Sequence, residues 1–141
     1  MSTTAMPKSV TTGDVARKIL ELARESPGFV YEPPPRSDDD GVRRCVYVAD
    51  VNGVLVGSCL VGRALIALGF APQQLTDRSK SAWMMLSYLG IRTAFSDPIN
   101  TPYWINDVQR NQDHKHTWSE AVDIASARFP RVVAELTKAA V

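Results

Sequence analysis

The sequence has few of the features by which a class of protein is usually recognised. Only two of its 141 residues are cysteines, Cys45 and Cys59, too few for the disulfide framework of a small secreted domain. No apolar run approaches the ~20 residues that cross a bilayer, and residues 1–13 lack the apolar segment of a signal peptide. We therefore expect a cytoplasmic protein without membrane contact, whose two cysteines stay unbridged.

The net charge is also small, at +1. A protein that binds nucleic acid usually carries a strong excess of basic residues, which is absent here. The segment 42–96 carries a balance of +4, from two acidic residues and six basic ones: Arg43, Arg44, Arg63, Arg78, Lys80 and Arg92. We expect these basic groups not to converge on one face, so that nucleic acid is not the expected partner.

What the chain does have is the composition of a folded domain. Hydrophobic residues make up 45% and charged residues 22%, ordinary values for a globular protein. A chain of this length buries roughly two-thirds of the surface that its unfolded form exposes, so it needs no metal or disulfide to fold. We predict a flexible tail over residues 1–10 and a single globular domain over 11–141. A mobile loop is expected near 33–41, where three prolines precede an acidic run.

Apolar residues recur at helical spacing along most of the chain. Capping residues, prolines and glycines then set the expected helix ends. The predicted helices cover residues 13–25, 60–68, 77–89, 101–114, 118–129 and 130–139. The last two are separated by Pro130, and a capping box at Thr117 and Glu120 opens the fifth. The predicted fold class is therefore α+β, mainly α, with five or six helices packed around one β-hairpin.

The hairpin is predicted from an Asn-Gly pair between two β-branched runs. Residues 44–50 and 54–57 flank Val51, Asn52 and Gly53, and both Asn and Gly tolerate positive φ. A two-stranded hairpin is marginal alone, so it must pack against the helices. Residues 29–31 form a further short β-prone run, which we interpret as an edge strand.

Cys59 stands directly after the second strand, at the beginning of a predicted helix. Free amides and the helix dipole stabilise a thiolate there, so Cys59 could act as the nucleophile of a hydrolase, with His114 or His116 as the base. Asp113 or Asp107 could orient that histidine. The alternative, which we favour, is a small buried residue beside Gly62, where a glycine lets the helix approach the hairpin closely.

Two further patterns have weak functional interpretations. The run Asp113-His114-Lys115-His116 lacks the spacing of a zinc site, and a polar turn after a helix explains it better, so no metal or other cofactor is expected. The helices 60–68 and 77–89 could form a helix-turn-helix with Arg78, Ser79 and Lys80 at the start of the recognition helix. The intervening turn is longer than that motif uses, which favours ordinary helix packing.

The aromatic residues leave two interpretations open. Five of them anchor either the core or an exposed partner surface: Trp83, Tyr103, Trp104, Trp118 and Phe129. On the helix at 101–114 the polar side chains of Gln109, Asn111, Gln112 and Asp113 lie opposite Trp104 and Val108. That pattern predicts a solvated polar face.

Two elements of the sequence carry a resemblance. The run Cys59-Leu60-Val61-Gly62 follows the hairpin, and the run 104–113 has the pattern W-x-x-x-V-Q-x-x-Q-D before the Trp118 helix. In both elements the chain resembles small uncharacterised proteins of actinobacteria and their bacteriophages. Judged by the order of the elements, the resemblance covers roughly residues 13–128. The resemblance implies an accessory protein of such a source and no catalytic residue.

These observations predict a protein-interaction module without catalytic activity. The expected partner is a host protein that the module modulates, and self-association is left open. The cysteine-dependent hydrolase with Cys59 and His114 or His116 is the alternative, and a helix-turn-helix-like DNA-binding protein comes third.

Overall fold

Helices make up most of the chain in the computed structural model, which describes residues 9–32, 46–77 and 80–139. Six α-helices and one antiparallel hairpin lie within these residues, so the predicted α+β, mainly α class is confirmed. The tail over residues 1–8, and residues 33–45 around the predicted mobile loop, lie outside the described ranges. The elements are α1 (Thr12–Glu25), β1 (Val48–Val51), β2 (Val54–Gly57), α2 (Leu60–Ala67), the 3₁₀ helix η1 (Pro72–Leu75), α3 (Ala82–Tyr88), α4 (Thr101–Asp113), α5 (Trp118–Arg128) and α6 (Pro130–Ala139).

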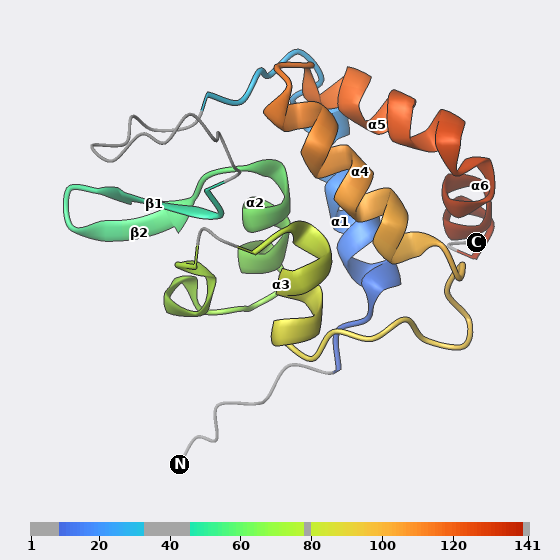
Figure 1. Cartoon of the computed structure of the whole chain (residues 1–141), viewed down its shortest axis with the longest axis horizontal. Coiled ribbons are helices and arrows are strands. Elements are labelled where there is room, and N and C mark those ends of the chain that lie inside the picture. Colours follow the sequence, from blue (N-terminus) through green and yellow to red (C-terminus); the bar gives the residue numbers. More distant parts are fainter. Residues whose placement is uncertain (1–8, 33–45, 78–79, 140–141) are drawn as a thin grey trace.

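The arrangement places α4 at the centre of the molecule. It packs on α5, α3, α1 and α2, while the hairpin lies at one end of the molecule and α6 at the other (Figure 1). Two large side chains of α4, Trp104 and Ile105, are fully buried, together with Trp118 of α5. The core therefore surrounds α4 on several sides.

Local sequence signals explain most of the helix ends. Capping boxes open α1 at Thr11 with Asp14 and α5 at Thr117 with Glu120, and α6 begins at Pro130. The largest departure is α3, which begins at Ala82 and not near Asp77. Its cap is Ser81, whose hydroxyl accepts a hydrogen bond from Met84 N at 3.3 Å. The 3₁₀ helix η1, which begins at Pro72, occupies part of the connection between α2 and α3.

The hairpin turns on two residues. Asn52 and Gly53 both have positive φ, 54° and 84°, as a type I′ turn requires, which confirms the conformation expected from the Asn-Gly pair. Val51 pairs with Val54 as part of the strand, so its assignment to the turn was wrong. The predicted strand at 29–31 is reduced to a single bridge between Val30 and Thr117.

A close approach between α2 and the hairpin depends on Gly62. A Cβ atom at this position would lie 2.0 Å from the carbonyl oxygen of Tyr47, far inside van der Waals contact. The expectation that Gly62 lets the helix reach the hairpin is confirmed. The approach also brings Ser58 N and Cys59 N to the carbonyls of Tyr47 and Val46, at 2.9 and 3.1 Å.

The substitution Gly62→Ala should therefore destabilise the protein by about 1–3 kcal/mol, although alanine favours helices. The clash is with backbone, which cannot rotate away as a side chain can. Gly28→Ala is the matched control, because nothing lies within 4 Å of a Cβ there. Chemical denaturation of both variants measures the difference, and equal stabilities would contradict this account of the α2 contact.

The polar face of α4 is the main correction to the sequence interpretation. Gln109, Asn111 and Gln112 were expected to face solvent, but they are 5%, 6% and 0% exposed. Each amide has a partner on another element. Gln109 Nε2 donates to the Tyr47 hydroxyl at 3.1 Å, and Asn111 Nδ2 donates to the carbonyl of Ala121 at 3.1 Å.

Gln112 holds two elements at once. Its Oε1 accepts from the backbone N–H of Leu60, in the first turn of α2, at 2.8 Å and from the indole N–H of Trp118 at 3.2 Å. Both donors are buried, so each would lose a hydrogen bond without replacement by water if the oxygen were removed. The Gln112 side chain thereby joins α2 and α5 to the C-terminal turn of α4.

Gln112→Met, which keeps the length of the side chain and removes its acceptor, should lower the free energy of unfolding by on the order of 2–4 kcal/mol. The control is Gln73→Met, on the exposed side of η1, where no comparable loss is expected. Equilibrium unfolding in urea distinguishes the two, and a Gln112→Met protein as stable as the control would contradict this role.

No helix in the described ranges has both the length and the apolar character needed to cross a membrane.

Candidate functional site

Cys59 lies at the N-cap of α2 and is fully buried. Its Sγ accepts from Gly62 N at 3.4 Å, and the sulfur is disulfide-bonded. The expectation of an unbridged cysteine is therefore wrong for Cys59. Cys45, the one other cysteine of the chain, lies outside the described residues. The nucleophile of a cysteine hydrolase is a thiolate, and Cys59 has no thiol in this structure.

The two histidines that could serve as a base have other surroundings. His114 is exposed at the C-cap of α4, and Nδ1 of His116 lies 3.7 Å from Oε1 of Glu120 on α5. The pKa of Glu120 is lowered, first by a hydrogen bond from the backbone of Thr117 and further by His116. Glu120 thus belongs to the capping box of α5, and His116 lies beside it.

The other sequence candidates can be placed in part. Among the described residues no group of three His, Cys, Asp or Glu side chains could hold a metal ion. Arg78 and Ser79, at the start of the proposed recognition helix, fall outside the described ranges, and Lys80 precedes α3. Residues 68–81, including η1, separate α2 from α3, which is not the short turn of a helix-turn-helix.

Asp107 is the buried acidic group of α4. Its carboxylate accepts from Nη1 of Arg128 on α5 and, at 3.4 Å, from Asn111 Nδ2. Arg128 is 56% exposed at its side chain, so the ion pair closes the core at its edge. Asp107 therefore holds α5 against α4 and is not positioned to orient a catalytic histidine.

Tyr47 is a second buried ionisable group. Its hydroxyl donates to the carbonyl of Lys80 at 2.7 Å and accepts from Gln109. Burial raises the pKa of this phenol far above its usual value, and the hydrogen bond from Gln109 opposes that effect. Tyr47 consequently stays protonated at neutral pH and ties the hairpin to the segment before α3.

The structure shows which of the five aromatic residues are buried and which are exposed, a distinction that the sequence left open. Trp104 and Trp118 are buried, whereas Trp83 and Tyr103 are 40% and 51% exposed. Their rings lie 4.7 Å apart, and Tyr103 stacks at 6.4 Å on the half-buried Phe129. Sequence could not distinguish these sets, because α4 contributes both a buried Trp and, one residue earlier, an exposed Tyr.

Two further apolar side chains of α3 are exposed. Met84 is 50% and Tyr88 is 61% exposed, and Nζ of Lys80 lies 4.8 Å from the centre of the Tyr88 ring. Positions four apart share one side of a helix, so Met84 and Tyr88 point the same way. We call the four residues Trp83, Met84, Tyr88 and Tyr103 the aromatic face.

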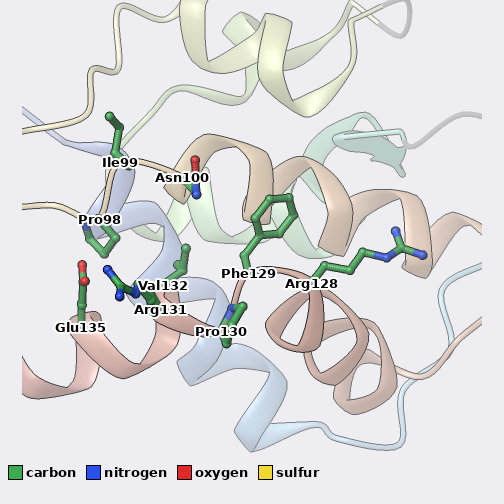
Figure 2. Close-up of a pocket in the computed structure, with 9 residues that line it drawn as sticks. All are labelled: Pro98, Ile99, Asn100, Arg128, Phe129, Pro130, Arg131, Val132 and Glu135. Atoms are coloured by element: carbon green, nitrogen blue, oxygen red, sulfur yellow. The ribbon is translucent and has the colours of Figure 1, made fainter.

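A pocket of about 280 Å³ adjoins this surface at the junction of α5 and α6 (Figure 2). The loop before α4 forms one wall and the beginning of α6 the other. Two arginines and one glutamate are its only charged residues. The lining consists of Pro98, Ile99, Asn100, Arg128, Phe129, Pro130, Arg131, Val132 and Glu135. Such a lining can bind an apolar group but contains no nucleophile beside a base.

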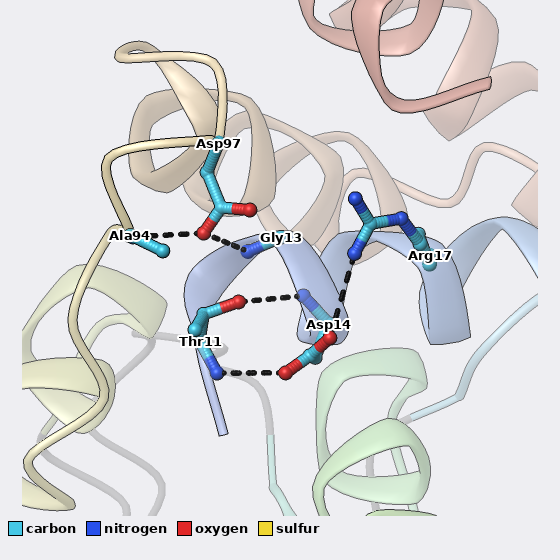
Figure 3. A network of polar contacts seen from close by, with 6 residues as sticks. All are labelled: Thr11, Gly13, Asp14, Arg17, Ala94 and Asp97. Atoms are coloured by element: carbon cyan, nitrogen blue, oxygen red, sulfur yellow. Dashed lines mark hydrogen bonds and ion pairs between the residues drawn. The ribbon is translucent and has the colours of Figure 1, made fainter. Parts of the chain in front are cut away.

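The wall at Pro98–Asn100 is held in place by Asp97 (Figure 3). Oδ2 of Asp97 accepts from Gly13 N, in the first turn of α1, at 3.2 Å and from Ala94 N at 2.9 Å. The negative carboxylate lies at the positive end of the helix dipole of α1, where it is stabilised. The loop is therefore fixed by α1, a contact between distant segments that no local pattern predicted.

Comparisons with protein-family models, with curated proteins and with solved structures found no match to this chain.

The state of Cys59 is open to direct measurement. When the protein is unfolded without reductant, the peptide that contains Cys59 should take up no iodoacetamide, because a disulfide sulfur is not a nucleophile. The same treatment after reduction should alkylate it. Alkylation of Cys59 in the unreduced protein would contradict the assigned bond.

Proposed function

We propose that this protein is a protein-interaction module without catalytic activity, and that the aromatic face binds its partner. The observation that carries the proposal is the exposure of two neighbouring aromatic rings and a methionine on α3 and α4. Trp, Tyr and Met are enriched at the centres of protein interfaces, where their large apolar surfaces are buried. Scattered single hydrophobic residues would not have this meaning, but three of these four lie on the one short helix α3, and the fourth, Tyr103, is in ring contact with Trp83.

The chemistry of the buried groups supports the same proposal. The buried polar side chains of α4, such as Gln112 and Asn111, make their hydrogen bonds within the protein and are not available to a substrate. The bond at Cys59 removes the thiol that the alternative hydrolase needs. No observation on the described residues favours that hydrolase or a DNA-binding helix-turn-helix over partner binding.

The source and the partner remain those that the sequence suggested. We propose an accessory protein of an actinobacterium or its bacteriophage that acts on a host protein, and the disulfide at Cys59 counts against the cytoplasm that the sequence led us to expect. The compartment is testable through Cys59, because cytosolic thiols are kept reduced. A disulfide that persists at Cys59 in freshly lysed, thiol-blocked cells would argue for an oxidising compartment instead.

Affinity capture from an actinobacterial lysate, followed by mass spectrometry, tests the function. The wild-type chain should capture a protein that Met84→Lys and Tyr88→Ala lose, since each change disrupts the aromatic face at an exposed position. Val54→Lys is the control, because Val54 is 61% exposed on the hairpin, outside that face. A buried aromatic contact contributes about 2 kcal/mol or more, so binding should weaken at least about tenfold.

Two results would overturn the proposal. Either the captured protein binds the two face variants as well as it binds the control, or turnover of a thiol- or oxygen-ester substrate depends on Cys59. Circular dichroism of each variant shows whether a loss of binding reflects a loss of fold.

A further inference from the structure

Phe95 is the most exposed large apolar side chain among the described residues. Its ring is fully accessible to solvent, although the backbone around it is held firmly. Asp97 N donates to the carbonyl of Ala94 at 2.9 Å, which closes a turn with Phe95 and Ser96 at its centre. The carboxylate of Asp97 fixes the same turn to α1 (Figure 3). The ring therefore projects from a rigid support, which lowers the entropic cost of binding it.

The same loop continues directly into the wall of the pocket. Pro98 and Ile99 line it from one side and Phe129 and Val132 from the other (Figure 2). A cavity of about 150 Å³ is enough to hold a benzene ring, and this pocket has about 280 Å³. The pocket thus has the size and the apolar lining to accept a phenyl group.

A projecting ring, and an apolar pocket whose wall begins three residues further along the same loop, are the two complementary parts that a two-fold interface between identical chains requires. In such an interface the contact of the first copy with the second is repeated in reverse. We propose that the occupant of the pocket is Phe95 of a second copy of this chain, and that two molecules exchange this ring reciprocally.

The charges at the rim fit a second copy better than an unrelated partner. Arg131 and Glu135 lie one turn apart on α6, and neither side chain has an ion-pair partner within the described ranges. Around a two-fold axis Arg131 of one molecule can meet Glu135 of the other, and the pair is then formed twice. The third charge, Arg128, is already engaged by Asp107.

This interface goes beyond the proposed function and uses different residues. The aromatic face on α3 can bind a partner whether the protein is monomeric or dimeric. Failure of one proposal therefore leaves the other standing, and Phe95 variants should still capture the protein that binds to the aromatic face.

Sedimentation equilibrium of the full chain over a concentration series tests the proposal. The wild type should associate as a dimer, and Phe95→Ser should raise the dimer dissociation constant at least about tenfold. Because the Phe95 ring is fully exposed in the single molecule, its removal takes away no packing within the protein. The variant should therefore fold and unfold as the wild type does. Val54→Ser, which removes an exposed apolar side chain from the hairpin, should leave the dissociation constant unchanged.

Charge exchange identifies the interface more specifically. Arg131→Glu and Glu135→Arg should each weaken the dimer, because like charges would face each other across the axis. The double variant should restore association, since it reverses both members of each pair. A wild-type monomer at every concentration, or a dimer indifferent to Phe95→Ser, would overturn the proposal and leave the pocket to a different occupant.

Discussion

The fold depends on amide side chains that one helix buries against its neighbours. Gln112 and Asn111 of α4 satisfy donors and acceptors on α2 and α5, and Gln109 reaches the hydroxyl of Tyr47 before the hairpin. A buried polar group without a partner costs about 1–3 kcal/mol. Other arrangements of these elements would leave the buried amides unpaired and would therefore be less stable. Apolar contacts around Trp104 supply most of the burial, while the amides specify the register of the packing.

The central position of α4 also determines which of its side chains are exposed at the surface. Because its polar side points inward as well as its apolar side, little of the helix is left for a conventional solvated face. Tyr103 is an exception, and its exposed ring lies 4.7 Å from the ring of Trp83 on α3. The loop before α4 is anchored to α1 by Asp97, which places Phe95 and the wall of the pocket. The proposed binding surfaces therefore derive from the same packing as the core.

The sequence predicted the elements whose signals are local. Capping boxes at Thr11 and Thr117, the Asn52-Gly53 turn and Pro130 each determine backbone geometry within a few residues, and these elements stand where they were expected. The polar face of α4 was assigned to solvent because Gln and Asn usually lie there. Their burial depends on donors that approach from residue 60 and residue 118, which no pattern within α4 reveals. The start of α3 was misplaced for a similar reason, since η1 and Ser81 compete with the earlier start near Asp77.

The candidate surfaces could be predicted only as alternatives. Hydrophobic periodicity cannot show which aromatic residue of a helix meets another element, so Trp83 and Trp104 had the same signal although only Trp104 is buried. The pocket at α5 and α6 combines residues some thirty positions apart, and its wall depends on the contact between Asp97 and Gly13. Such features require the tertiary structure.

Hydrogen–deuterium exchange of the full chain, alone and with the captured partner, tests the central claim of a binding surface on α3 and α4 most directly. The account predicts that the partner slows exchange at residues 82–90 and at the first turn of α4, and leaves the hairpin unchanged. Protection confined to the hairpin or to α2, with exchange in α3 unaltered, would contradict it.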